Sequence, residues 1–206
     1  MIDLLVATTN PGKFAEVQAH LRDLPLRIRS LQSIAQPPTV VEDGETFEAN
    51  ALKKARTLAQ FSGVATLADD SGLEVDALGG APGIYSARYA GAEADDDRNN
   101  RKLLRELASV PEAKRSARFV CALALCAPRI DGGKEWIARE SCEGRIALAL
   151  QGSQGFGYDP LFFFPPFGKT FGEIERDVKA TVSHRGKALA KLVAALPALI
   201  DLPVKP

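Results

Sequence analysis

The sequence predicts an α/β protein with a mixed β-sheet. Apolar runs typical of strands alternate along the chain with segments whose apolar residues recur at helical spacing. Residues 117–127, "ARFVCALALCA", are apolar on both faces, as in a central strand that is covered on both sides. A hydrophobic content of 46% in 206 residues is sufficient for a sizeable core. We therefore expect a single α/β domain spanning residues 1–206.

The first part of the chain predicts a strand, a helix, a strand and a loop in turn. Residues 2–9, "IDLLVATT", form the opening apolar strand. Asn10 then suits a helix N-cap and Pro11 the first helical position. The apolar residues of this helix follow at helical spacing: Phe14, Val17, Leu21 and Leu24. Residues 27–31 predict a second strand, and residues 35–45 predict a loop.

Residues 46–60 predict a second helix, which leads into a third strand. One face of this helix is apolar: Phe47, Ala51, Ala55, Leu58 and Ala59. The strand covers residues 64–68 and ends at two adjacent aspartates, Asp69 and Asp70, which precede a Ser-Gly turn. Adjacent carboxylates repel one another, and burying them costs free energy unless cations or hydrogen bonds compensate. This pair therefore needs a chemical explanation.

The second half predicts a helix, three strands and a final helix. Residues 95–108 form the first of these helices, with acidic residues at its start that suit the positive end of the helix dipole. After the central strand, residues 134–150 predict two strands, with turns at residues 131–133 and near Gly144. The final helix covers residues 184–196 and turns five apolar residues inward: Ala188, Leu189, Leu192, Val193 and Leu196.

Charge and composition exclude several classes of protein. Lys and Arg number 26, and so do Asp and Glu, so we expect no nucleic-acid partner. No apolar run has transmembrane length, so we expect no membrane association. Because no basic segment follows Met1, we expect no secretory signal and a cytoplasmic protein. The three cysteines match no metal-binding or disulfide pattern and are expected to be buried thiols.

Residues 8–13, "TTNPGK", lie between the first strand and the first helix. The N-terminus of a helix presents free backbone N–H groups and the positive end of its dipole, which favours phosphate. Thr8, Thr9 and Asn10 add polar side chains, and Lys13 adds a positive charge. The segment is a candidate phosphate site, although the same residues also suit a simple helix cap beside a solvated lysine.

Carboxylates form a second group of candidates. Four lie just before or within the second helix: Glu42, Asp43, Glu45 and Glu48. That helix leads into the strand ending at Asp69 and Asp70, so these groups can meet at one edge of a sheet. Mg²⁺ takes one or two carboxylates together with substrate phosphates, and a further carboxylate can deprotonate water. The four acids are equally compatible with a solvated loop and helix start, and the aspartate pair with a turn cap.

Two loops contain groups suited to a flat ring. "GFGYDP", residues 155–160, places Phe156 for stacking and Asp159 for accepting a hydrogen bond from a ring N–H. "ALGGAPGIYSARYAG", residues 77–91, interleaves tyrosines with Arg88 and is either a ligand-binding loop or a surface loop that its tyrosines anchor.

A third such segment, "KATVSHRGKAL", covers residues 179–189 at the start of the final helix. Lys179, His184 and Arg185 are suited to donating hydrogen bonds to exocyclic oxygens or phosphate. The alternative is that His184 and Arg185 only cap the helix and form an ion pair. His20 has no such company and is expected on a helix surface.

Together these motifs resemble the inosine/xanthosine triphosphate pyrophosphatase family, whose members hydrolyse deaminated purine nucleoside triphosphates. The resemblance is carried over residues 2–196 by "ATTNPGK", "TFEANALKKA", "LADDSGLEVDALGGAPGIYSARYAG", "GFGYDP" and "SHRGKAL". It implies conversion of dITP, ITP and XTP to the monophosphate and pyrophosphate, with Mg²⁺ as cofactor. It also implies a homodimer and an elongated fold of two lobes around a cleft, with a central mixed sheet flanked by helices.

The resemblance also implies roles for individual residues. The triphosphate is expected to bind the first loop: Thr8, Thr9, Asn10, Pro11, Gly12 and Lys13. Asp70 is implied as the proton acceptor and as a metal ligand, with Ser71 beside the substrate. The other substrate contacts are implied at Phe156, Gly157, Tyr158, Asp159, Lys179, His184 and Arg185.

The second metal ligand is ambiguous because two positions depart from the family pattern. The acid expected just before the helix asparagine falls at Ala49, with Glu48 one place earlier. The loop acid is also shifted, since Val41 precedes Glu42 and Asp43. We favour Glu42 as the second ligand.

In this hypothesis Mg²⁺ and the substrate phosphates neutralise the paired aspartates, and water activated near Asp70 attacks the α-phosphorus. Buried donors that match a 6-oxo group leave adenine badly paired. One alternative is a related pyrophosphatase acting on modified pyrimidine nucleotides, and another is a nucleotide sensor without turnover. An RNA- or DNA-binding module is disfavoured by the balanced charge.

Overall fold

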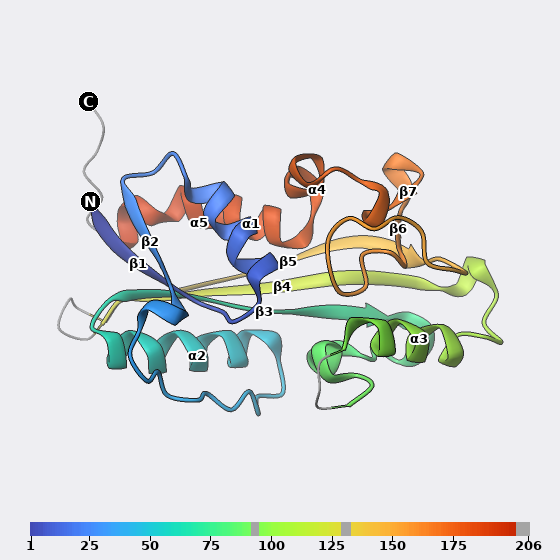
Figure 1. Ribbon diagram of the computed structural model, residues 1–206, viewed down its shortest axis with the longest axis horizontal. Helices are drawn as coiled ribbons and strands as arrows, with labels where there is room; N and C mark the ends of the chain where they lie inside the picture. Colours follow the sequence, from blue (N-terminus) through green and yellow to red (C-terminus); the bar gives the residue numbers. More distant parts are fainter. Residues whose placement is uncertain (92–94, 129–132, 201–206) are drawn as a thin grey trace. The chain divides into compact units, whose positions relative to one another are not determined.

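A computed structural model describes residues 1–91, 95–128 and 133–200. Within these residues seven strands form one sheet in the order β2-β1-β3-β4-β5-β6-β7 (Figure 1). Strand β1 is parallel to β2 and β3, whereas β6 is antiparallel to β5 and β7. The predicted α/β class, with a mixed sheet flanked by helices, is confirmed.

The elements follow the predicted order, with additions near the C-terminus. The strands are β1 (Ile2–Ala7), β2 (Leu26–Ser30), β3 (Ala65–Val75), β4 (Ser116–Cys126), β5 (Glu135–Ile146), β6 (Phe162–Phe164) and β7 (Lys169–Thr170). The helices are α1 (Pro11–Leu21), α2 (Phe47–Ser62), α3 (Asp96–Glu106), α4 (Arg176–Val182) and α5 (His184–Leu199). The short elements β6, β7 and α4 were not foreseen, because two- to seven-residue segments carry too little periodicity to be recognised.

Local signals set the starts of α1 and α2 as predicted. The Asn10 side chain accepts a hydrogen bond from the Lys13 N–H at 3.0 Å, and Pro11 opens α1. The Thr46 side chain accepts from the Ala49 N–H at 3.1 Å, and Gly63 ends α2 with φ of 65°. The predicted loop over residues 35–45 contains no helix or strand.

The chain divides into two compact units. The first unit comprises Met1–Asp70, Cys121–Glu140 and Gly186–Pro206, and the second comprises Ser71–Val120 and Ser141–Arg185. Strands β3, β4 and β5 and helix α5 contribute residues to both. The single domain predicted over residues 1–206 stays a prediction.

The first unit buries its core between sheet and helices. Helices α1 and α5 cover one face of its strands, and α2 covers the other (Figure 1). The predicted inward residues of α5 lie in this core: Ala188, Leu189, Leu192 and Leu196 are fully buried, and Val193 packs against them. The predicted apolar face of α2 is buried in the same unit. All three cysteines are buried and form no disulfide, as predicted.

The second unit has an aromatic core. Phe119 of β4 lies with its ring centroid 4.6 Å from that of Phe162 and 6.0 Å from that of Phe171. The His184 ring stacks on Phe119, with the two ring centroids 4.8 Å apart. Leu103 and Leu107, in and after α3, are fully buried in the same cluster. This core supports the loop that contains Phe156 and Asp159.

Two strand predictions were wrong. Strand β3 does not end at the aspartates but continues through Ser71 and Gly72 to Val75. Leu73 and Val75 are fully buried on one face, so apolar alternation resumes after the polar residues. The Leu73 N–H donates to the Ser86 hydroxyl at 2.8 Å. A Ser-Gly pair therefore did not indicate a turn here.

The two strands predicted within residues 134–150 are one strand, β5. Gly144 lies inside it, where an added Cβ would stand 2.6 Å from both the Phe162 ring and the Phe163 carbonyl oxygen. Glycine is needed for the close approach of β6, not for a turn. The other predicted turn, at residues 131–133, lies outside the described residues except for Gly133.

Among the described residues, no helix has the combination of length and apolar character that crossing a membrane requires.

Candidate active site

The first loop, residues 8–13, joins β1 to α1 and is held by internal hydrogen bonds. The Asn10 N–H donates to the Thr8 hydroxyl at 3.1 Å, and the Asn10 side chain caps α1. Lys13 is not solvated, because its Nζ lies 2.5 Å from Asp69 Oδ1 and its side chain is only 17% exposed. The helix therefore directs a cation toward the aspartate pair.

Asp69 is compensated within the first unit. Besides the Lys13 ammonium at Oδ1, its Oδ2 accepts a hydrogen bond from the buried Cys121 thiol at 3.2 Å. Lys13 belongs to α1, and Cys121 belongs to the core cluster that α1 and α5 cover. Asp69 is thus a buried carboxylate with a paired charge, which is the condition under which burial is tolerated.

Asp70 has a different environment. Adjacent strand residues point to opposite faces. Lys13 of α1 acts on both aspartates, whereas the other groups that act on Asp70, Lys54, Glu42 and Asn50, come from α2 and the loop before it. Burial raises the pKa of Asp70 to about 6, against the opposing effect of Lys13 and Lys54, while Glu42 raises it further. Its Oδ2 is buried without a hydrogen-bond partner among the described residues. The pleat of β3 therefore separates the two carboxylates that the sequence places side by side.

The residues around Asp70 distinguish Glu42 from the other candidate acids. Lys54 Nζ lies 2.7 Å from Glu42 Oε1, and both are partly buried. The Gly44 N–H donates to Asn50 Oδ1 at 2.7 Å, which ties the loop to α2. Of the groups that shift the pKa of Asp70, Asn50 has the smallest effect and lowers it. The Nδ2 atom of Asn50 has no hydrogen-bonding partner among the described residues.

The remaining acids of this group are exposed or lie beside cations that are not part of the Asp70 cluster. Asp43 pairs with Lys53 on the surface, and that ion pair lowers the pKa of Asp43. Glu45 is exposed, and Glu48 lies 3.5 Å from Arg139. Of the four acids, Glu42 is the one positioned to act on Asp70.

Glu42 and Asp70 fit a magnesium ion that shares its ligands with a substrate. In the described residues no group of three or more His, Cys, Asp and Glu side chains is arranged to hold a metal ion. Mg²⁺ commonly takes only one or two carboxylates and completes its octahedron with water and phosphate oxygens. The unpartnered, buried Oδ2 of Asp70 is the structural feature that such an ion would satisfy.

Sequence reasoning missed three residues at this site. Lys54 and Asn50 act on Asp70 from α2, and Cys121 donates to Asp69 from β4. Asn50 and Lys54 are four residues apart and so share one helix face, a signal that was available beside the apolar face of α2. No sequence signal marks Cys121, because it lies within an apolar run.

The predicted base-contacting residues meet in the second unit. Asp159 Oδ2 accepts from the Phe156 N–H at 2.9 Å and lies 2.5 Å from Lys179 Nζ, with both charged groups buried. Lys179 Nζ and the Arg185 guanidinium lie 5.2 Å and 5.7 Å from the centre of the Phe156 ring. Arg185 donates to the Ser71 hydroxyl at 2.8 Å.

Gly155 makes this arrangement sterically feasible. Its φ is 77°, and a Cβ added there would lie 1.9 Å from Asp159 Oδ2. Only glycine combines this backbone conformation with room for the carboxylate. The "GFGYDP" loop is therefore built around Asp159.

Three other residues predicted to contact the substrate also lie in the second unit: Gly157, Tyr158 and His184. The Tyr158 hydroxyl donates to the Ser86 carbonyl at 2.8 Å, and its ring belongs to the aromatic core. His184 is buried against Phe119. Gly157 donates its N–H to Asp96 Oδ2 at 2.7 Å. Roles for these three in substrate binding stay predictions.

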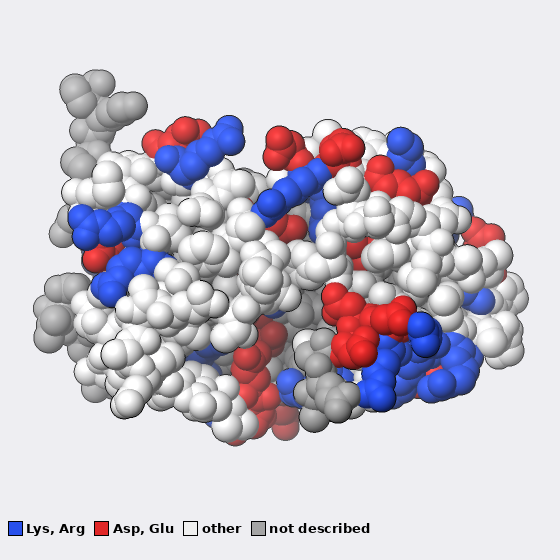
Figure 2. All heavy atoms as spheres, in the orientation of Figure 1, with Lys and Arg blue, Asp and Glu red and all other residues white. Residues whose placement is uncertain are grey.

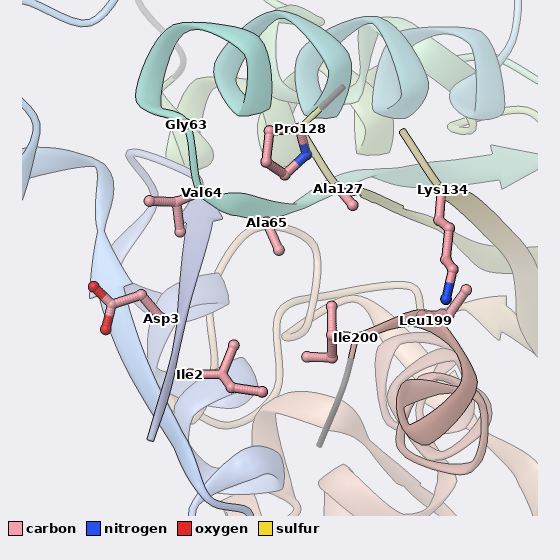
Figure 3. A pocket seen from close by; sticks show the side chains of 10 residues that line it. All are labelled: Ile2, Asp3, Gly63, Val64, Ala65, Ala127, Pro128, Lys134, Leu199 and Ile200. Atoms are coloured by element: carbon pink, nitrogen blue, oxygen red, sulfur yellow. The ribbon is translucent and has the colours of Figure 1, made fainter. Parts of the chain in front are cut away.

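A cavity elsewhere in the first unit contains none of the predicted site residues. It measures about 310 Å³ and is bounded by side chains from β1, the start of β3 and the end of α5, including Ile2, Asp3 and Ile200 (Figure 3). Lys134, also on its wall, donates to the Ala198 carbonyl at 3.1 Å. The mixture of apolar walls and internally paired charges offers no converging polar groups for chemistry.

Comparison with known proteins identifies relatives along nearly the whole chain. A family model described as the Ham1 family matches residues 4–195. A dITP/XTP pyrophosphatase of Syntrophobacter fumaroxidans is 52% identical over 92% of this chain and 79% of its own length. One from Geobacter sulfurreducens is 52% identical over 93% of this chain and 95% of its own. The solved structure of a HAM1 protein from Coxiella burnetii superposes with a TM-score of 0.86, at 39% identity, over 96% of this chain and 100% of its own.

Proposed function

The chain belongs to the Ham1 family, and on this basis we propose that it is a nucleoside triphosphate pyrophosphatase. Its substrates are dITP, ITP and XTP, and its products are the nucleoside monophosphate and pyrophosphate. The observation that carries the proposal is Asp70, a buried carboxyl with a pKa near 6 and an unpartnered oxygen, beside Glu42 and two lysines. The names of the relatives, dITP/XTP pyrophosphatase, point to two of these substrates.

The residues of the first unit account for the phosphoryl chemistry. The α1 N-terminus and Lys13 bind the triphosphate, and Glu42 and Asp70 hold Mg²⁺. The ion supplies neutralisation of the negative charge on the phosphates. Asp70 accepts a proton from water as the water oxygen bonds to the α-phosphorus, and the bond from that phosphorus to the bridging oxygen breaks to release pyrophosphate. Lys13 stabilises the leaving group by charge.

Asp69 acts through Lys13. A lysine on a surface loop rotates freely, whereas Lys13 is held 2.5 Å from a buried carboxylate that Cys121 also binds. Its ammonium is therefore positioned before substrate binds, and the conformational entropy of the lysine side chain is lost during folding rather than during binding. The paired aspartates thus divide the work: Asp69 positions a cation, and Asp70 accepts the proton.

The residues of the second unit account for base selection. The Phe156 ring offers a stacking surface, and Lys179 and Arg185 are cations beside it. These donors match the 6-oxo group of hypoxanthine and xanthine but face the 6-amino group of adenine with another donor. Such a mismatch leaves buried polar groups unpaired and can cost about 10⁴-fold in discrimination.

We further infer a homodimer that acts in the cytoplasm on free nucleotides and has no nucleic-acid partner. The family resemblance supports the first two inferences, and the equal numbers of acidic and basic residues support the third. Light scattering coupled to gel filtration tests the dimer, and a single species at the mass of one chain would contradict it.

The function is tested by product analysis with the intact protein. It is incubated with Mg²⁺ and, separately, ITP, XTP, GTP and ATP, and pyrophosphate and orthophosphate are assayed in parallel. We expect pyrophosphate from ITP and XTP and little from GTP or ATP. Orthophosphate as the product would instead indicate a phosphatase, and binding without any product would indicate a nucleotide sensor.

A further inference from the structure

A basic groove lies on helix α3 in the second unit, and none of the residues that line it is assigned to catalysis or base binding. It encloses about 490 Å³ and is lined by Ala90 together with four cations of α3: Arg98, Arg101, Lys102 and Arg105. Figure 2 shows Lys and Arg side chains gathered over α3, beside a group of acidic side chains. No acidic residue is among the described residues that line the groove.

The spacing of these cations puts them on one side of the helix. They occupy positions i, i+3, i+4 and i+7, which form a single stripe on an α-helix. The stripe from Arg98 to Arg105 extends about 10 Å along the axis at 1.5 Å per residue. Like charges at these spacings repel one another, so the stripe costs stability unless anions offset it.

The protein's own acids offset only part of this charge. Arg101 pairs with Asp97 at 2.5 Å and Lys102 with Glu106 at 3.7 Å, and both pairs are on the surface, where ion pairs are weak and exchange readily. Arg105 is exposed, and within the described residues its guanidinium has no hydrogen bond or ion pair. Arg98 also has an interaction of its own, so the donors available to an external anion are those of Arg105 and those that the exchanging surface pairs release.

The wall opposite the helix is fixed. Buried Asn99 accepts from the Ala90 N–H at 2.7 Å and donates to the Ala87 carbonyl at 3.0 Å. Lys102 donates to the Tyr89 carbonyl at 2.8 Å and lies 4.1 Å from the centre of the Tyr89 ring. Residues 87–90 are therefore held against the helix, so this part of the groove is formed before any ligand binds.

We propose that this groove binds an oligophosphate, either free or as the phosphate chain of a nucleotide. Guanidinium groups bind phosphate through paired N–H donors, and four cations over about 10 Å match a chain of several phosphates better than a single anion. A volume of about 490 Å³ is within the range of small-ligand sites. The described residues that line the groove are four cations and an alanine, so the phosphate chain is the recognised group.

Binding is tested by amide chemical-shift mapping on the isotopically labelled, full-length protein. The probes are inorganic tripolyphosphate, ATP and, at matched ionic strength, sulfate, all without Mg²⁺. We expect the amide signals of residues 98–105 to shift with tripolyphosphate at a saturable, millimolar or tighter dissociation constant. These signals are distinct from those of residues 8–13, so binding at the proposed catalytic loop is read separately.

Variants assign the effect to the groove. Arg98→Gln/Arg105→Gln should weaken binding there by at least about tenfold, because two charge-assisted contacts are lost. The matched control is Arg22→Gln, which removes an exposed arginine of the first unit, and it should leave the dissociation constant unchanged. Pyrophosphate release from ITP should be unchanged in both variants, because neither touches the catalytic residues.

Some outcomes identify the source of the bound phosphate, and others would overturn the proposal. Equal affinity for tripolyphosphate and ATP would assign the site to the phosphate chain alone, and tighter binding of ATP would assign it to a nucleotide. Shifts that sulfate reproduces, that do not saturate, or that persist in the double variant would reduce the groove to a nonspecific cationic surface and overturn the proposal.

Discussion

Replacing Asp70 with asparagine should abolish turnover and yet stabilise the protein at neutral pH. Asparagine has nearly the same shape but cannot accept the proton of the attacking water or carry a negative charge for a metal. A positioned general base contributes about 10²–10⁴-fold to a rate, and the lost metal ligand adds to this. We therefore expect pyrophosphate release from ITP to fall by at least about 10³-fold.

The gain in stability follows from the pKa of Asp70. Burial raises this pKa from 3.8 to about 6, so the folded state favours the protonated carboxyl. The protonated Asp70 carboxyl stabilises the folded state; this contribution is fully present below pH 3.8 and is lost as the pH rises through about 6. The difference corresponds to about 3 kcal/mol, the cost that the ionised group imposes on the metal-free fold above pH 6.

Asparagine carries no such cost at any pH. At pH 8 in EDTA the variant should therefore be more stable than wild type by up to about 3 kcal/mol, which for a chain of this size is several degrees in Tm. Near pH 4 the two Tm values should converge, because Asp70 is then protonated in the folded state.

Thermal denaturation of both proteins from pH 4 to pH 8, with and without Mg²⁺, measures this effect alongside a pyrophosphate assay. Saturating Mg²⁺ should stabilise wild type and not the variant. A variant that retained activity within a few-fold of wild type would falsify the assignment of Asp70 as proton acceptor. A variant less stable than wild type at pH 8 would refute the reasoning about its burial.

Three further substitutions test the site and the fold. Glu42→Gln should raise the Mg²⁺ concentration for half-maximal activity by about tenfold or more. The control is Asp43→Asn, which changes the next residue, paired with Lys53 on the surface, and should leave that concentration unchanged. Equal effects of the two variants would contradict the assignment of Glu42 as a metal ligand. Lys179→Met should destabilise the protein by about 3–5 kcal/mol, because it removes the ammonium that neutralises the buried Asp159 carboxylate. Denaturant unfolding measures this loss, and an unchanged midpoint would mean that the pair is solvated. Gly144→Ala should cost about 1–3 kcal/mol by overpacking against β6, and a neutral result in the same assay would show that β6 is not closely packed there.

The sequence by itself determined the elements whose signals are local. Asn10 and Pro11 start α1, and Thr46 starts α2, because a cap depends on residues within one turn. The apolar stripe of α5 and the doubly apolar β4 were likewise readable from periodicity alone. Local composition also identified the first loop as a candidate phosphate site and the aspartate pair as candidate site residues, and these two roles stay predictions.

Only the tertiary structure showed that these residues have different surroundings. The contact of Lys13 with Asp69 joins residues 56 apart in the chain, and Cys121 lies 52 residues beyond Asp69. No local pattern encodes such contacts, because they depend on which helix packs on which face of β3. Two carboxylates that are equivalent in the sequence thus become different groups, Asp69 paired with a lysine and Asp70 buried with a raised pKa, since adjacent residues of a strand face opposite sides.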